Sequence, residues 1–552
     1  MASQQLDALV VGTGFGGIYQ LKRLLDQGLS AKAIDKASDV GGTWYWNRYP
    51  GAMSDTNSFV YRFSWDHEDL VEYPWDTQYL QGPDILKYLK HVVKRHNLRE
   101  HMQFETELLA ATWDNSTRRW KVGLSTGEII IVKYLVTALG LLSKTNFPDI
   151  PNLDKFQGKL YHTANWPTNP DLKGKRVGVI GNGSTGVQLI TAVAKADEVK
   201  ELLCFQRSPQ YSVPARNAVL SPQERKEIND NYEEIWLKTK ESLFAFGFEE
   251  TTRPTFSVTP EERERIYEEA WQKGNGFRFM FWTFGDIVID EKANLEAQEF
   301  IRKKIRQTVK DPEKARKLCP TELYARRPLC DSGYYEQFNR DNVNIVDIKT
   351  NPITELTPNG IKTADGKVYD LDIIVCATGF DAVDGNYTRI AIKGRGETMK
   401  DHWADIGPTS YLGIMVPNFP NLFMIAGPNG PFANLPAVIE TQVDIISDLI
   451  ARVEKSAATK PNVVKESSDC QSNSNVKKYG VIEAEKEAED KWTKLCEELS
   501  AASLFRKVDS WVFGRNVPGK KKAVMFYFGG LGPYRKEVAA VVEDNMKGFR
   551  IS

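Results

Sequence analysis

The chain has 552 residues, a formal net charge of -1 and a hydrophobic content of 41%. This length exceeds what one ordinary hydrophobic core holds, so we expect a globular protein of two or three domains. Because the charge is nearly balanced and no long run of like charge occurs, the sequence argues against a surface for nucleic acid or membrane.

Targeting and metal-binding patterns are not seen. The N-terminus runs directly into an apolar strand pattern, without the basic and apolar regions of a secretory signal. The most apolar stretch, residues 411–427, contains two prolines and is not expected to span a membrane. The six cysteines include no C-x-x-C pair and the six histidines no H-x-x-x-H pair, so neither a dithiol centre nor a metal site is expected. Separated thiols without a signal peptide predict a cytoplasmic protein.

A first nucleotide-binding unit opens the chain. An apolar strand pattern over residues 6–11 is followed at once by GTGFGG, a helix pattern over residues 18–27 and a second strand, 31–34, that ends in Asp35. In this G-x-G-x-x-G pattern the first glycine permits a tight turn, the second lets the backbone approach a pyrophosphate, and the third lets helix and strand pack closely. Asp35 is placed to bind ribose hydroxyls, which makes an empty glycine-rich turn the less favoured interpretation.

The stretch GGTWYWNRYPGAMSD (residues 41–55) follows. A loop with four aromatic residues, an arginine and Asp55 is costly to order unless it packs against something planar or charged. The alternative is a structural loop whose Trp44 and Trp46 cover the domain. Beyond it we expect a helix over 82–96 and strands at 108–113, 120–122 and 128–140.

A second unit repeats this architecture after the stretch FQGKLYHTANWP (residues 156–167). RVGVIGNGSTGVQLI carries a second G-x-G-x-x-G, but its second strand, 201–205, continues into Gln206, Arg207 and Ser208 instead of an acid. A guanidinium binds the 2′-phosphate of NADP, which an acid would repel, so this unit favours NADP whereas the first favours FAD or NAD. The alternative for Arg207 is a solvated surface arginine.

Residues 221–319 are rich in Glu, Lys and Arg and lack the alternation of a strand. This pattern predicts a helical insertion, with helices at 223–242, 261–273 and 294–309. The aromatic run FRFMFWTF (277–284) is either core or the border of a pocket. After Arg326 and Arg327 we expect a buried strand over 368–382 that runs into ATG and a strand over 421–428, both returning to the first unit. A helix at 437–450, a polar loop at 467–475 and a helix at 482–499 follow.

Together, the two fingerprints, GGTWYWNRYPG, FQGKLYHTANWP and ATGFD resemble the type I Baeyer–Villiger monooxygenases over nearly the whole chain. The pattern F-x-G-x-x-x-H-x-x-x-W-P is matched at Phe156, Gly158, His162, Trp166 and Pro167, and is far more specific than either fingerprint. The resemblance implies an α/β fold with two Rossmann-like dinucleotide-binding domains and a helical insertion in the NADP domain. The boundaries we expect are 1–150 and 381–552 for the FAD-binding domain, 151–220 and 320–380 for the NADP-binding domain, and 221–319 for the insertion.

The resemblance also implies the reaction: conversion of a ketone to an ester or lactone with NADPH and O2 through a peroxyflavin, with sulfides as further substrates. Arg327 is then the arginine that stabilises the peroxide and the negative oxygen of the adduct, and Asp55 pairs with it. Arg207 and Arg326 are implied to contact cofactor phosphate, and Trp511 the nicotinamide ribose. The full set of expected cofactor-binding residues is Gly12, Gly14, Phe15, Gly17, Asp35, Lys36, Gly42, Thr43, Trp44, Tyr49, Asp55, Gly181, Gly183, Ser184, Thr185, Gly186, Gln188, Arg207, Ser208, Arg326, Ala377, Thr378, Gly379 and Trp511.

Other interpretations stand beside these. Without the resemblance, Arg326 and Arg327 would be a surface basic pair and Asp55 a cap or turn residue, and His162 is taken as a structural linker residue instead of a base. Rival functions are a heteroatom-oxidising flavin monooxygenase, which has a different linking motif, and a non-catalytic redox sensor, which has no need of Asp55 and Arg327. A disulfide reductase would need paired thiols. A ketone and O2 are the expected partners, and a monomer or weak oligomer the expected state.

Overall fold

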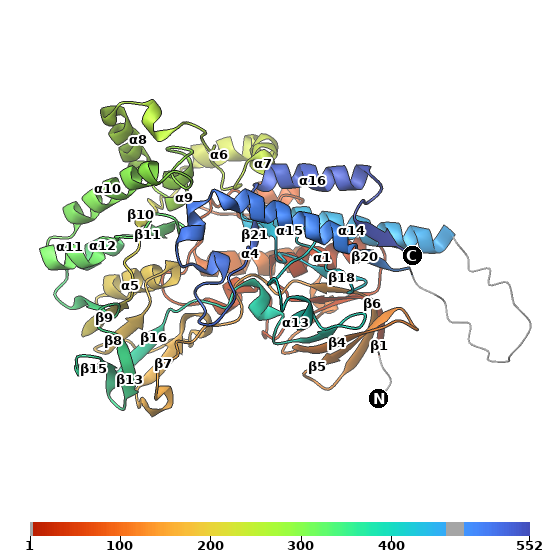
Figure 1. Cartoon of the computed structure of the whole chain (residues 1–552), viewed down its shortest axis with the longest axis horizontal. Helices are drawn as coiled ribbons and strands as arrows, with labels where there is room; N and C mark the ends of the chain where they lie inside the picture. Colours follow the sequence, from red (N-terminus) through yellow and green to blue (C-terminus); the bar gives the residue numbers. More distant parts are fainter. Residues whose placement is uncertain (1–3, 460–479) are drawn as a thin grey trace, which may run out of the picture.

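The computed structural model describes residues 4–459 and 480–552, so the polar loop predicted at 467–475 lies outside the described residues. Two large sheets organise the fold, at the right and lower left of Figure 1. The first contains, in spatial order, β17 (Ala391–Lys393), β4 (Leu108–Asp114), β5 (Arg119–Leu124), β6 (Ile129–Thr137), β1 (Gln4–Val11), β2 (Ala31–Ile34) and β3 (Met102–Gln103), with β18 (Leu422–Met424) also paired to β6. The second is entirely parallel, in the order β12 (Val343–Asp347), β9 (Glu201–Gln206), β8 (Arg176–Ile180), β16 (Ile373–Cys376) and β7 (Lys159–His162).

The strand β1 is buried on both faces, as a central parallel strand must be. Ala8 and Val10 pack in one core with α1 (Phe15–Asp26) and α14 (Leu435–Thr459), whereas Leu9 and Val11 point into a second core under β4, β5 and β6. Because side chains alternate across a strand, the continuous apolar run fills both cores. The predicted α/β fold with two nucleotide-binding units is confirmed.

Helices fill residues 222–318 and lie above the second sheet, in yellow-green to green, in Figure 1. The helix predicted over 223–242 is two helices, because Asn231 ends the first and its side chain donates to the carbonyl oxygen of Glu227 (2.7 Å). Proline at the first helical position and a side-chain cap at Ser221, Thr259 or Asp311 start three of the helices sharply. These elements are α6 (Pro222–Asp230), α7 (Tyr232–Glu241), α8 (Pro260–Lys273), α9 (Gly276–Phe281), α10 (Glu291–Thr308) and α11 (Pro312–Leu318).

The prediction of a single strand over residues 368–382 is wrong, because this segment forms two strands. It is divided into β15 (Val368–Asp370), which belongs to a small antiparallel sheet with β13 (Ile353–Thr357) and β14 (Gly360–Thr363), and β16. Asp372 interrupts the strand because its carboxylate accepts hydrogen bonds from the backbone N–H (2.8 Å) and guanidinium (3.0 Å) of Arg176. The expectation that the strand before ATG returns to the first unit is also wrong, since β16 lies between β8 and β7 of the second sheet.

The helix predicted over 482–499 begins later than expected. Residues 482–484 form β20 (Ile482–Ala484), which pairs antiparallel with β22 (Phe549–Ile551), and the helix α15 spans Lys486–Ala501. Ile482 is held in the strand because its N–H donates to the side-chain oxygen of Asn421 (2.8 Å). Two further helices contribute to the site, α2 (Thr43–Trp46) and α5 (Ser184–Ala196), whereas α4 (Gly82–Arg95) and α16 (Leu531–Glu543) lie outside it. Within residues 4–459 and 480–552, every helix is too short or too polar to cross a bilayer.

Candidate active site

A continuous cavity of about 1230 Å³ connects the carboxyl ends of β1 and β8. The carboxyl ends of parallel strands are where open α/β sheets bind ligands. Of the residues expected to bind cofactor, all except Gly17 and Gly186 line this cavity, as do both residues expected to be catalytic. One cavity therefore unites residues that lie more than 450 positions apart, from Gly12 to Trp511.

Gly17 and Gly186 do not line the cavity; each has the packing role expected of the third glycine of a fingerprint. A Cβ atom on Gly17 would lie 1.8 Å from the carbonyl oxygen of Gly12, and one on Gly186 would lie 2.2 Å from that of Gly181. Each third glycine thus packs against the first glycine of its own fingerprint. These two residues shape the turn without facing a ligand.

The second glycines, Gly14 and Gly183, both line the cavity. A Cβ atom on Gly183 would meet no protein atom within 4 Å, so a ligand can approach the backbone there. Neither α1 nor α5 has a side chain that caps its first N–H groups. Uncapped N–H groups at the start of a helix form an anion site, so both turns suit a pyrophosphate.

Asp35 lines the cavity and also holds the first fingerprint. Its carboxylate accepts hydrogen bonds from the backbone N–H (2.7 Å) and hydroxyl (2.9 Å) of Thr13, and from the N–H of Ala37 (2.9 Å). Only 9% of Asp35 is exposed. The acid at the end of β2 therefore fixes the turn between β1 and α1.

The loop 41–55 joins the two units. Gly42 packs on the first fingerprint, because a Cβ atom there would lie 2.8 Å from the Cα of Gly14. At its far end, the hydroxyl of Tyr49 donates to Oε1 of Gln188 on α5 (2.8 Å), and Nε2 of Gln188 donates to the carbonyl oxygen of Met53 (3.2 Å). Burial raises the pKa of Tyr49 to about 12, so this phenol stays a neutral donor.

Arg327 lies where the two units meet. Its Nη2 donates to Oδ2 of Asp55 (2.7 Å), and its Nη1 donates to the hydroxyl of Ser184 (2.9 Å) and the carbonyl oxygen of Pro328 (3.1 Å). The guanidinium lies over the ring of Phe277, 5.0 Å from its centre. Burial disfavours the charge, but Asp55 together with Cys330 and Tyr49 outweighs burial and raises the pKa of Arg327, so a fixed cation faces the cavity.

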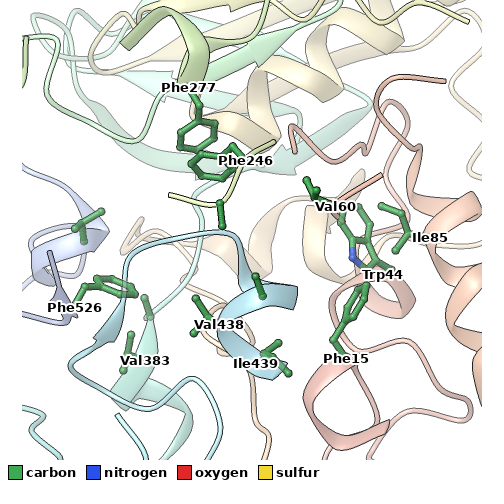
Figure 2. Close-up of a cluster of buried hydrophobic side chains, with 14 of the residues drawn as sticks. Phe15, Trp44, Val60, Ile85, Phe246, Phe277, Val383, Val438, Ile439 and Phe526 are labelled. Carbon is green, nitrogen blue, oxygen red and sulfur yellow. The ribbon is translucent and has the colours of Figure 1, made fainter. Parts of the chain in front are cut away.

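An apolar wall lies beside this cation. Figure 2 shows Phe246 and Phe277 next to each other, and Phe526, Ile439 and Phe15 apart from this pair on segments from other parts of the chain. The ring centres of Phe246 and Phe277 are 4.0 Å apart. All five of these residues line the cavity. The run 277–284 is thus both pocket border and core, because its other phenylalanines are buried within the helical insertion.

The far end of the cavity is basic. Arg207 is exposed, and among the described residues no carboxylate lies within salt-bridge distance of it. Arg326 forms an ion pair with Glu322, and its Nε donates to the carbonyl oxygen of Asp509 (3.0 Å). Asp509 begins the segment that carries Trp511, whose ring meets that of Phe526 edge to face at 5.8 Å.

Comparison with known proteins decides the family. The profile of the flavin-binding monooxygenase-like family matches residues 7–209. A Baeyer–Villiger monooxygenase of Pseudooceanicola batsensis is 49% identical, over 98% of this chain and 95% of that protein. A phenazine N-monooxygenase of Lysobacter antibioticus is 48% identical, over 98% and 96%. The crystal structure of a cyclohexanone monooxygenase from Rhodococcus sp. Phi1 bound to NADP+ superimposes with a TM-score of 0.94, at 52% identity and full coverage of both chains.

The chain belongs to the type I Baeyer–Villiger monooxygenases. It is an FAD-containing, NADPH-dependent oxidoreductase that converts ketones to esters or lactones. Its cavity fits both cofactors: two glycine turns with open helix N-termini suit two pyrophosphates, and an exposed cation, Arg207, which has no carboxylate partner among the described residues, suits a phosphate.

His162, in the pattern that marks the Baeyer–Villiger monooxygenases, does not face the cavity. It is 2% exposed at the end of β7, and its Nδ1 accepts from the N–H of Ala164 (3.1 Å). Burial lowers its pKa, so the imidazole is neutral. Its ring packs against Phe147 and Phe380. These contacts support its interpretation as a linker residue.

Sequence reasoning missed several residues along the cavity of this monooxygenase. Phe246 lies in a segment for which no element was predicted, and Arg389 follows the ATGFD stretch by eight positions. Their only sequence signals were an aromatic alternation (FAFGF) and an isolated arginine. The loop after Gly427 and the residues after Asp55 also contribute lining residues, such as Phe432 and Thr56.

Proposed function

We propose that Arg327 is the catalytic cation of this Baeyer–Villiger monooxygenase and that Asp55 orients it. The observation that carries the proposal is the 2.7 Å ion pair between them, at the point of the cavity where both fingerprints and the apolar wall meet. Bound FAD and NADPH would supply the reducing electrons and the activation of O2, and one oxygen atom of O2 would be transferred to the ketone. The chain supplies a fixed positive charge directed at the negative oxygen that develops on the ketone, usually the largest single catalytic contribution.

The residues around Arg327 complete its role. Asp55 and Ser184 bind its two terminal nitrogens, so the guanidinium is oriented before substrate arrives. Phe246 and Phe277 exclude water from one side, which strengthens the interaction of the cation with a developing oxyanion. The fixed orientation of the guanidinium and the low local dielectric therefore both stabilise the negative oxygen that develops on the substrate.

We propose the cofactor domains accordingly. Residues 1–150 and 381–552 bind FAD, 151–220 and 320–380 bind NADPH, and 221–319 supply the wall that contains Phe246 and Phe277. The two sheets support this division, since β1–β6, β17 and β18 form one and β7–β9, β12 and β16 the other. Arg207 and Arg326 are the proposed contacts of the 2′-phosphate, and Trp511 of the nicotinamide ribose.

Small cyclic ketones are the proposed substrates, because the relative with the TM-score of 0.94 is named for cyclohexanone and the wall beside Arg327 is apolar. The test is NADPH oxidation by the FAD-loaded enzyme with cyclic, linear and aryl ketones, with products identified by mass spectrometry. Lactone from cyclohexanone is expected. Hydrogen peroxide alone, with no ester from any ketone, would contradict the proposal.

Heteroatom oxidation is a second candidate, supported by the relative named phenazine N-monooxygenase, which is 48% identical. A substrate bound in the same cavity would then be oxidised at a nitrogen or sulfur atom instead of at a ketone carbonyl. Adding phenazine and an alkyl aryl sulfide to the panel separates the two functions. N-oxide or sulfoxide without any ester would favour this candidate.

Replacing Arg207 by Ala is expected to raise the KM for NADPH by about tenfold or more and to leave that for NADH nearly unchanged. The physical reason is that a charge-assisted hydrogen bond contributes about 1.5–3 kcal/mol and only NADPH carries the phosphate. Steady-state kinetics with both cofactors measure the effect. Arg316→Ala is the matched control, because Arg316 is an exposed arginine paired with Glu313. Equal changes for both cofactors would remove Arg207 from the phosphate site.

A further inference from the structure

A carboxylate lies directly behind the basic end of the cavity, in contact with residues that line it. Glu322 precedes Arg326 by four positions and forms an ion pair with it. The same carboxylate accepts a hydrogen bond from the Nζ of Lys349 (3.1 Å) and another from the hydroxyl of Ser208 (3.3 Å). Two of these three partners, Ser208 and Arg326, line the cavity.

The position of these groups follows from the second sheet. Ser208 comes two residues after β9, and Lys349 comes two residues after the neighbouring strand β12, with Gln206 opposite Asp347. Both strands run parallel, so their carboxyl ends deliver a hydroxyl and a cation to the same edge. Glu322 reaches that edge from the segment after α11.

Electrostatics keep Glu322 ionised. Burial opposes its charge, but Arg326 and Lys349 outweigh burial and hold the pKa of Glu322 below its usual range. At this end, Arg326 and Lys349 are already paired with Glu322, whereas Arg207 has no carboxylate partner in the part of the chain that the structure describes. A phosphate dianion that approaches Ser208 and Arg326 is therefore repelled by the carboxylate of Glu322, which is bound to both residues.

We propose that Glu322 is a specificity-determining residue for the nicotinamide cofactor: its carboxylate occupies the donors of Ser208 and Arg326 until a 2′-phosphate replaces it. This inference rests on the proposed phosphate site at Arg207 and Arg326. Competition between two anions for the same donors lowers the affinity for a 2′-phosphorylated nucleotide, and it leaves a nucleotide without that phosphate unaffected. Glu322 thus narrows the difference in affinity between NADPH and NADH.

The test is Glu322→Gln in the FAD-loaded enzyme, since the amide keeps the shape of the side chain and can still accept from Ser208. Isothermal titration calorimetry with adenosine 2′,5′-bisphosphate and with 5′-AMP isolates the 2′-phosphate from catalysis. We expect the Kd for the bisphosphate to fall about fivefold at low salt, the Kd for 5′-AMP to stay unchanged, and the difference to shrink at high salt. Glu313→Gln, at an exposed carboxylate paired with Arg316, is the matched control.

An unchanged or weaker binding of the bisphosphate by Glu322→Gln would overturn the inference, because Glu322 would then only position Arg326. The phosphate site itself is tested separately by Arg207→Ala in the same titration. If Arg207→Ala weakens binding of the bisphosphate and Glu322→Gln does not strengthen it, the inference about Glu322 is wrong but the phosphate site stands. If neither variant changes the Kd for the bisphosphate, both the inference about Glu322 and the proposed phosphate site are wrong.

Discussion

Replacing Arg327 by Ala is expected to lower the rate of ester formation by about 10³-fold, while the protein keeps its full content of FAD. Arg327 is the cation directed into the cavity between Asp55 and the ring of Phe277, and the Ala variant lacks this positive charge. FAD binding is expected to persist because the first fingerprint, its uncapped helix and Asp35 are untouched. Product formation by mass spectrometry and the absorbance ratio of flavin to protein measure the two effects.

Arg327→Lys is the charge-conserving comparison. A lysine retains the positive charge but presents one nitrogen, so it cannot bind Asp55 and Ser184 together as the guanidinium does. We expect activity between those of the native enzyme and the Ala variant. Ester formation by Arg327→Ala at more than a tenth of the native rate would exclude Arg327 as the catalytic cation.

Gly17→Ala is expected to produce a protein without FAD, because the added methyl group has no room. Its Cβ would lie 1.8 Å from the carbonyl oxygen of Gly12, which cannot move away freely. Gly12 has φ of +109°, and its own Cβ position lies 2.3 Å from the carbonyl oxygen of Ala138 at the end of β6. Overpacking of this kind costs about 3 kcal/mol or more, and here it would displace the turn that faces the pyrophosphate.

Flavin stoichiometry and thermal unfolding measure this effect. Gly123→Ala in β5 is the matched control, because its nearest neighbour, the carbonyl oxygen of Ala110, is 3.9 Å from the added Cβ. The control is expected to bind FAD normally. A Gly17→Ala protein with stoichiometric FAD and an unchanged melting temperature would refute the packing argument.

Much of the local structure was predictable because it depends on neighbouring residues. The β2 strand, the fingerprint turns and the start of α4 at Gly82 lie where apolar periodicity, glycine spacing and proline placed them. The specific linking pattern led to the Baeyer–Villiger monooxygenases, which the relatives confirm. Periodicity failed where a polar contact overrode it, as at Asp372, which interrupts the strand that includes β16, and at Ile482, which is held in β20.

The sequence by itself determined the two nucleotide-binding units, the family and the residue types of the site, since each of these lies in a contiguous stretch of chain. Only the tertiary structure decided that β16 joins the second sheet, that Gly17 and Gly186 do not line the cavity, and that Arg327 binds Ser184 as well as Asp55. The role of Glu322 could not be predicted from the sequence either, because it depends on contacts with Ser208 and Lys349, which are distant in the chain. Strand order and ion pairs depend on the distance between side chains in space, and that distance is decided when separate segments share one core.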